Sequence, residues 1–84
     1  MTPHDKFFEY DGQRISYREG QILLAYARGI TIEQTAKDLF LSESTIKRHR
    51  ENLRRRFSLQ GYHKLRCFAT ELQPELEKWI EKPT

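Results

Sequence analysis

Residues 42–57, Ser-Glu-Ser-Thr-Ile-Lys-Arg-His-Arg-Glu-Asn-Leu-Arg-Arg-Arg-Phe, form one basic, amphipathic stretch in a chain of 84 residues. On a helix, Ile46, Leu53 and Phe57 fall on one apolar face, with the stem of Arg50 beside them. The stretch holds six Lys or Arg and two Glu, so its net charge is +4, against +3 for the whole chain. A helix with one apolar and one basic face has the shape and charge that fit a DNA major groove. The basic face consists of Ser44, Lys47, Arg48, Glu51 and Arg55.

Two shorter helices are predicted before this stretch from their capping signals. Ser16-Tyr-Arg-Glu19 has the spacing of a capping box, in which each side chain accepts a hydrogen bond from the other residue's backbone N–H. Gly29 is a typical C-terminal cap for the helix that begins there. Thr31-Ile-Glu-Gln34 repeats the capping box. The residues expected to face inward are Ile22, Leu23, Tyr26 and Ala27 in the first helix and Ile32, Thr35, Ala36 and Leu39 in the second.

The second short helix and the basic stretch are joined by a tight turn. Phe40 and Leu41 form an apolar turn, and Ser42 is the expected cap of a third helix over about residues 43–57. Two capped helices separated by such a turn, the second of them basic, are typical of a helix-turn-helix.

Residues 15–59 resemble the DNA-binding domain of LuxR/GerE-type bacterial transcription regulators, a module also found in NarL-like response regulators. The family pattern Leu-Thr-x-Arg-Glu-x-x-(Val/Ile)-Leu is matched by residues 15–23, Ile-Ser-Tyr-Arg-Glu-Gly-Gln-Ile-Leu. The signature Ile-Ser-x-x-Thr-Val-Lys-x-His is matched by residues 41–49, Leu-Ser-Glu-Ser-Thr-Ile-Lys-Arg-His, and Gly29 matches the Gly before the second helix.

The sequence departs from the family pattern at four positions. Gly20 replaces a long polar residue, and Ile32 replaces the usual polar residue after the cap of the second helix. Ser58 stands where Gly commonly ends the recognition helix, and Tyr62 stands where Arg is common.

The resemblance implies an all-α, four-helix helix-turn-helix domain over residues 15–72, whose fourth helix spans residues 62–72. We expect a short N-terminal extension over residues 1–14 and a C-terminal helical tail over residues 73–84, in which Pro74 starts a short extra helix. The Asp-Gly pair at positions 11 and 12 would suit a small hairpin, which is marginal alone in water. We favour docking of the nearby aromatic side chains on the domain, namely those of Phe7, Phe8 and Tyr10.

In the family, the residues just after the Thr of the signature contact base edges, and they correspond to Lys47, Arg48 and Glu51. Lys47 and Arg48 can donate to guanine O6 and N7, and Glu51 can accept from a cytosine amino group. Glu51 can instead orient Arg48 or Arg55, which is the role we favour. His49 can either contact DNA or pack against the first helix. The candidate contacts to the DNA backbone are Thr31, Ser44, Thr45, His49, Arg54, Arg55 and Arg56.

A second apolar stripe recurs at helical spacing within residues 62–72, and by resemblance this helix forms a dimer contact. The alternative is that the stripe packs on the first helix. Cys67, the only cysteine, excludes an intrachain disulfide and favours a reducing compartment. It is either a redox switch that bridges two subunits or an ordinary thiol. The predicted dimer interface consists of Tyr62, Leu65, Phe68, Ala69 and Leu72.

Composition narrows the class of protein. A pI near 9.2 suits a nucleic-acid partner, and a mean hydropathy of −0.83 with 32% charged residues excludes a membrane span. The N-terminus lacks a secretory signal pattern. Enzyme activity, a cofactor and a metal site are not expected, because there is no Gly-rich phosphate loop and the three histidines lack metal-ligand spacing.

The expected partners are double-stranded DNA and a second copy of the chain, in the cytoplasm of a bacterium and associated with its nucleoid. One alternative is a promoter-binding module like region 4 of a sigma factor, held by RNA polymerase. Another is an anti-regulator that interacts with proteins and no longer binds DNA. The residues before Ser16 are too few to form the sensor domain usual in LuxR-type proteins, so we expect either a stand-alone regulator, which Met1 favours, or a fragment.

Overall fold

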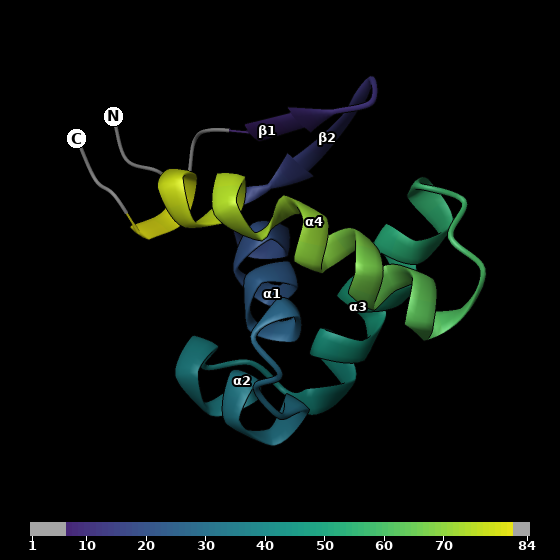
Figure 1. The fold of residues 1–84 in the computed structure, drawn as a ribbon. Coiled ribbons are helices and arrows are strands. Elements are labelled where there is room, and N and C mark those ends of the chain that lie inside the picture. The colour runs from purple at the N-terminus through teal and green to yellow at the C-terminus, as the bar shows by residue number, and fades with distance from the viewer. Residues whose placement is uncertain (1–6, 82–84) are drawn as a thin grey trace.

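The computed structural model describes residues 7–81, which form a small hairpin followed by four helices (Figure 1). The fold is the predicted four-helix domain, with α1 at its centre and α4 crossing it. The elements in chain order are β1 (Phe7–Tyr10), β2 (Gln13–Ser16), α1 (Tyr17–Ala27), α2 (Ile32–Leu39), α3 (Glu43–Arg56) and α4 (Gly61–Glu81).

The predicted N-terminal caps of the first three helices are formed. At the start of α1, the Glu19 N–H donates to Ser16 Oγ at 3.1 Å and the Ser16 N–H donates to Glu19 Oε1 at 3.0 Å, which completes the capping box. Ser42 Oγ accepts from the Thr45 N–H at the start of α3.

The second capping box is only half formed, which corrects the prediction for α2. Thr31 Oγ1 accepts from the Gln34 N–H at 3.1 Å, as expected. The Gln34 side chain, however, donates to Asp38 Oδ1 at 2.8 Å, one turn further along the helix. A carboxylate acceptor at i+4 therefore takes the amide that would otherwise reach back to the cap.

Three helices end with a residue in the left-handed region of φ. Gly29 has φ 74°, as predicted for a C-terminal cap, whereas Phe40 has φ 57° and Ser58 has φ 53°. In each case the next residue donates its N–H to the carbonyl five positions earlier, which is the Schellman arrangement. Non-glycine residues adopt this conformation at a cost of about 1–2 kcal/mol. The α2 and α3 ends are thus strained, and Phe40 is also 94% exposed.

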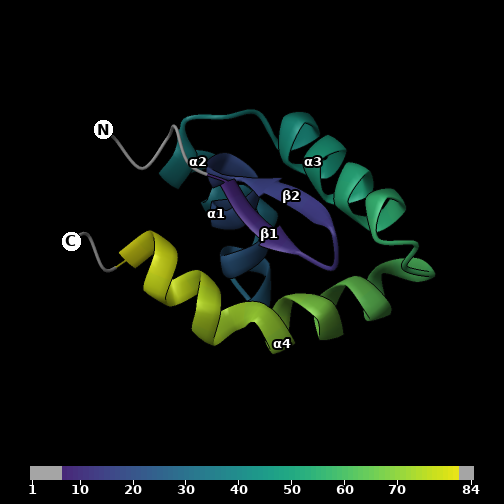
Figure 2. The ribbon, with the colours of Figure 1, turned by 90° about the horizontal axis from the view of Figure 1, so that it is seen from above.

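The separate C-terminal helix expected from Pro74 is not formed, because α4 runs unbroken from Gly61 to Glu81 with Pro74 inside it. Proline removes one backbone hydrogen bond from a helix interior. Leu72 and Leu76, on either side of Pro74, are both buried in the core, and this packing holds the helix together across the proline. Figure 2 shows α4 curving along its length. The boundary expected after residue 72 therefore lies inside a helix, and residues 82–84 lie outside the described part.

Within the described residues, the core consists of two apolar clusters. The larger joins α1, α3 and α4 with β2, and Leu53 and Leu65 are fully buried in it. The smaller is formed by Ile22, Ala36 and Ile46 and fastens α2 and α3 to α1. No helix within residues 7–81 combines the length and apolar character needed to cross a membrane.

Residues 7–16 form the hairpin, with Asp11 at φ 53° and Gly12 at φ 77° in its turn. Figure 2 shows it above α1, between α3 and α4. Phe8 stacks on Trp79 at 5.6 Å between ring centroids, and Tyr10 contacts Phe68 at 5.5 Å, so these two aromatics dock as predicted. Phe7 does not, because it is 57% exposed.

Candidate nucleic-acid interface

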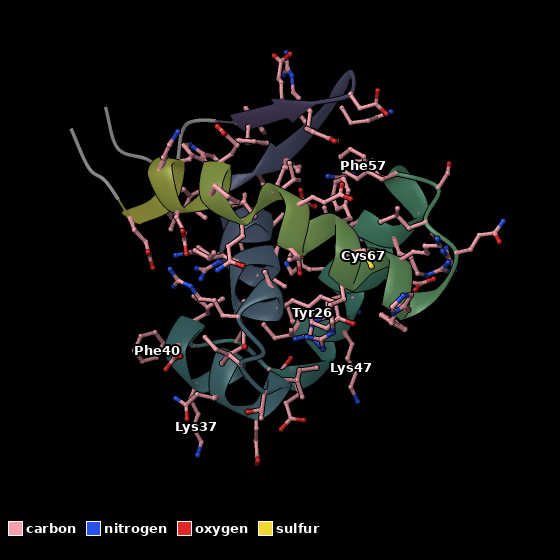
Figure 3. The ribbon with its side chains drawn as sticks, viewed as in Figure 1. Tyr26, Lys37, Phe40, Lys47, Phe57 and Cys67 are labelled. Carbon is pink, nitrogen blue, oxygen red and sulfur yellow. The ribbon has the colours of Figure 1, made fainter. Side chains whose placement is uncertain are left out.

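The amphipathic division predicted for α3 is confirmed. Ile46 and Leu53 are fully buried against the rest of the chain. The opposite face carries exposed polar side chains, and Figure 3 shows Lys47 projecting away from the body of the domain. The exposed residues of this face are Ser44, Lys47, Arg48 and Arg55.

Lys47 and Arg48, the predicted base-contacting cations, are both exposed. Within the part of the chain that the structure describes, neither takes part in an ion pair with a carboxylate. Their charged groups are therefore free to meet an external anion or a base edge.

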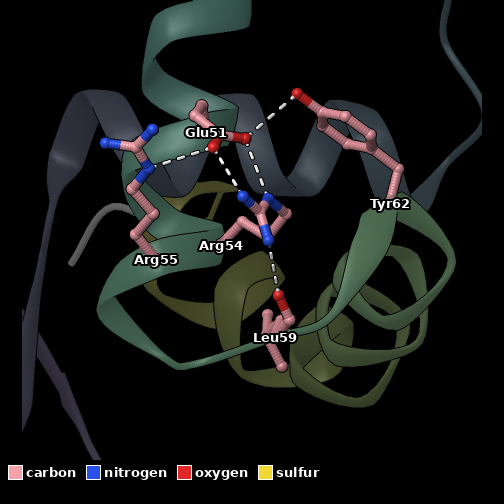
Figure 4. A network of polar contacts seen from close by, with 5 residues as sticks. All are labelled: Glu51, Arg54, Arg55, Leu59 and Tyr62. Carbon is pink, nitrogen blue, oxygen red and sulfur yellow. Dashed lines mark hydrogen bonds and ion pairs between the residues drawn. The ribbon is translucent and has the colours of Figure 1, made fainter.

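Glu51 is held by its own chain (Figure 4). Arg54 donates to both carboxylate oxygens, at 2.8 and 2.6 Å, and Arg55 Nε donates to Oε2 at 3.0 Å. The Tyr62 hydroxyl donates to Oε1 at 3.3 Å. The hydrogen bonds from Arg54 are the main reason that the pKa of Glu51 falls to about 2. Glu51 thus orients Arg55, as we favoured, but its second partner is Arg54 and not Arg48.

Arg54 and Arg56 both form ion pairs with glutamates of the same chain, and their role as contacts to the DNA backbone stays a prediction. Besides binding Glu51, Arg54 donates to the Leu59 carbonyl at 2.9 Å and so fastens the turn after α3. Arg56 donates to both carboxylate oxygens of Glu19, at 2.7 and 2.8 Å, and to the Arg14 carbonyl at 2.8 Å. It therefore ties the end of α3 to α1 and β2. Of the three consecutive arginines only Arg55 is mainly exposed, with 75% of its side chain accessible.

The remaining predicted backbone contacts lie near the starts of α2 and α3. Thr31 is exposed and caps α2, and Ser44 is exposed in the first turn of α3. Thr45 is half-buried and shares a hydrogen bond with the Ser42 hydroxyl at 2.8 Å. His49 is half-buried, and its Nδ1 is enclosed without a hydrogen-bond partner among the described residues. Its environment is that of the packed histidine we proposed as the alternative.

Most of the predicted dimer stripe of α4 is buried in the chain's own core. Four of its five residues are at most 8% exposed. They pack in the cluster that also contains Leu23 and Leu24 of α1, which is the alternative stated above. Tyr62 is the fifth, and it is partly exposed beside Glu51. Cys67 is exposed on α4, with Sγ 3.8 Å from His63 Nε2. The buried four are Leu65, Phe68, Ala69 and Leu72.

Sequence reasoning missed a cationic cluster beside α3. The guanidinium carbons of Arg50 and Arg66 each lie over the Tyr26 ring, 4.3 Å from its centroid. The Tyr26 hydroxyl donates to the Tyr62 carbonyl at 3.2 Å. One signal was present in the sequence, since Arg50 sits beside the apolar face of α3, where a charged side chain needs a partner.

The sequence was compared with protein-family profiles, with known proteins and with solved structures. The profile of a family described as bacterial regulatory proteins, luxR family, matches residues 13–69. Three matching relatives, all from Pseudomonas putida, are the response regulator protein TodT, and each is 35% identical over 65 residues. The match covers 77% of this chain and 29% of TodT, so the chain spans less than a third of the length of these relatives. No solved structure matches the chain significantly.

Proposed function

The chain belongs to the LuxR family of bacterial regulatory proteins, a family of helix-turn-helix transcription regulators, and we propose that it binds specific sequences of double-stranded DNA through α3 in the major groove. One observation carries the proposal. α3 buries Ile46 and Leu53 against its scaffold and exposes Lys47 and Arg48 without carboxylate partners among the described residues. A helix presented in this way fits the width of the major groove and can donate to base edges.

We assign the proposed role of each cationic side chain of α3 from its exposure and from its ion pairs within the described residues. Lys47 and Arg48 read base edges, where one good contact discriminates against a wrong base by about 1–3 kcal/mol. Arg55 contacts phosphates, because its side chain is mainly exposed and Glu51 only orients it. Hydroxyl and backbone groups at the exposed helix starts complete the phosphate contacts, at Thr31, Ser44 and Thr45.

We also propose that the chain acts as a dimer through the exposed face of α4, since helix-turn-helix proteins commonly bind paired half-sites as dimers. Cys67 lies on that exposed side of the helix and offers a direct measurement. Mild oxidation should form a Cys67–Cys67 cross-link on DNA with two half-sites and none on DNA with one. Sedimentation of the reduced chain on the same two duplexes should give two copies and one copy, respectively.

The central experiment is selection of bound sequences from a random pool of duplex DNA, followed by affinity measurements on the enriched site and on a scrambled duplex. Lys47→Ala and Arg48→Ala should weaken binding to the enriched site more than binding to scrambled DNA. Lys37→Ala is the matched control, since Lys37 is an exposed lysine on α2 that lies apart from Lys47 (Figure 3). A pool without enrichment, or equal losses on both duplexes, would refute sequence-specific recognition by α3.

A further inference from the structure

The Tyr26 cluster, which comprises Tyr26, Arg50 and Arg66, contains two guanidinium groups and no acid. Among residues 7–81, Arg66 donates only to the Tyr26 carbonyl, at 3.2 Å, and the Nε of Arg50 is buried without a hydrogen-bond partner. The chain does supply carboxylates elsewhere. Four other arginines pair with glutamate, namely Arg28, Arg54, Arg55 and Arg56.

Neither guanidinium group of the cluster forms an ion pair with a carboxylate among the described residues. Burial lowers the pKa of Arg50, and the charge of Arg66 lowers it further, while Tyr26 and Tyr62 act in the opposite direction. Stacking over an aromatic ring offsets part of this cost for each guanidinium. A bound anion beside the guanidinium groups would reduce the repulsion between them.

A surface pocket gives an anion access to Arg50. It has a volume of about 390 Å³ and is lined by Tyr26, Ile32, Lys47, Arg50 and Tyr62. Lys47 therefore belongs both to the pocket wall and to the exposed face of α3. A polyanion that contacts Lys47 on that face therefore also lies beside the pocket.

We propose that this pocket receives a phosphodiester of the DNA backbone that flanks the groove occupied by α3, an inference that rests on the proposed function. The phosphate is held by Arg50, with Arg66 adding positive charge from the other group over Tyr26. Guanidinium groups match phosphate oxygens in geometry and can bind two at once. Free inorganic phosphate has the same chemistry, but a duplex presents its phosphates in a continuous row on each side of the groove.

The test uses Arg50→Gln, Arg66→Gln and the double variant in the full 84-residue chain. Affinity for the enriched and the scrambled duplex is measured across a range of salt concentrations. Losing one phosphate contact should reduce the slope of log K against log salt by about 0.9. Both duplexes should lose affinity by the same factor, because a phosphate contact carries no sequence information. Arg66 is exposed, so Arg66→Gln keeps the test valid if Arg50→Gln fails to fold.

Arg14→Gln is the matched control, because Arg14 also lies over an aromatic ring, that of Phe7, but on the hairpin. It should leave the salt slope unchanged. The duplex is then neutralised one phosphate at a time with methylphosphonate. We expect one flanking position at which neutralisation weakens the wild type but not the double variant.

The outcomes separate this inference from the proposed function. Selective binding by the wild type, with salt slopes unchanged in all three variants, overturns the phosphate pocket and leaves the DNA-binding proposal standing. A wild type that binds no duplex overturns both. Saturable shifts of the Arg50 and Arg66 side-chain NMR signals with inorganic phosphate, without a methylphosphonate-sensitive position, would assign the pocket to a free anion and refute the backbone contact.

Discussion

Gly20 and Trp79 lie so close together that a Cβ added to Gly20 would stand 2.6 Å from Cζ3 of Trp79. Real Cβ atoms essentially never come so near another atom, so the α1 position must be glycine for the indole to lie where it does. Trp79 also packs edge-on against Tyr17, with ring centroids 5.6 Å apart. The glycine that departs from the family pattern in α1 and the C-terminal half of α4 are thus two sides of one contact.

Gly20→Ala should destabilise the protein, although the same change inside a helix normally stabilises by about 1 kcal/mol. The added methyl group overpacks against Trp79, and overpacking typically costs about 1–3 kcal/mol. The free energy of unfolding, measured by urea denaturation, should therefore fall.

The control for this prediction is Gly20→Ala in a Trp79→Ala background. Without the indole, the methyl group meets less resistance and the helix-propensity gain should dominate. A destabilisation of equal size in both backgrounds would show that the contact with Trp79 is not the cause.

Glu19→Gln should remove part of the acid sensitivity of folding. Burial raises the pKa of Glu19, but hydrogen bonds from Arg56 and from the Ser16 N–H outweigh it, so the pKa lies below its ordinary value of 4.5. Because the folded-state pKa is depressed, the carboxylate stabilises the fold fully above the ordinary value and loses this effect as pH falls through the depressed one.

At pH 7 the substitution should cost about 1–3 kcal/mol, since it leaves Arg56 with a weaker partner. Urea denaturation between pH 7 and the acid range should show a smaller loss of stability in Glu19→Gln than in the wild type. Parallel curves would mean that another carboxylate controls acid unfolding.

Glu51→Gln should increase affinity for any duplex. The carboxylate accepts hydrogen bonds from Arg54 and Arg55 and adds a negative charge beside the face proposed to contact DNA. Its removal frees Arg55 and reduces repulsion from phosphates, so the salt slope should steepen on enriched and scrambled DNA alike. Anisotropy titrations measure both, and Glu75→Gln, at an exposed position of α4, is the control. Weaker binding confined to sites with one particular cytosine would instead give Glu51 a base-reading role.

The features predicted best from the sequence are those that depend on residues only a few positions apart. The capping box at Ser16 and Glu19 needs only two side chains three positions apart, and the exposed face of α3 follows from helical periodicity. The intrachain partners of the three consecutive arginines, Arg54, Arg55 and Arg56, could not be predicted in this way. Successive residues on a helix point in different directions, and the partner of Arg56 is Glu19, 37 positions earlier in the chain.

The helix boundary predicted at Pro74 was wrong for a related reason. A proline rule is local, whereas the burial of Leu72 and Leu76 is a tertiary effect that keeps α4 continuous. The stripe over residues 62–72 was ambiguous in the sequence, because a core face and a dimer face share the same apolar period. Only the position of α1 distinguishes them.

Ser58→Gly should stabilise the protein. Ser58 has φ 53° in the Schellman turn that ends α3, where its N–H donates to the Arg55 carbonyl. Glycine relieves a left-handed strain of about 1–2 kcal/mol and gives back about 0.4–1 kcal/mol through the greater freedom of the unfolded chain. The expected net gain is about 0.5–1 kcal/mol by urea denaturation.

Gly29→Ala is the reciprocal control, since Gly29 holds the same position after α1 at φ 74° and an added Cβ would meet nothing within 4 Å. It should lose a similar amount for the same backbone reason. A loss of stability in Gly29→Ala without a gain in Ser58→Gly would contradict the prediction for Ser58. The hydrogen bond from Arg54 to the Leu59 carbonyl, and not the backbone strain at Ser58, would then determine the stability of the turn after α3.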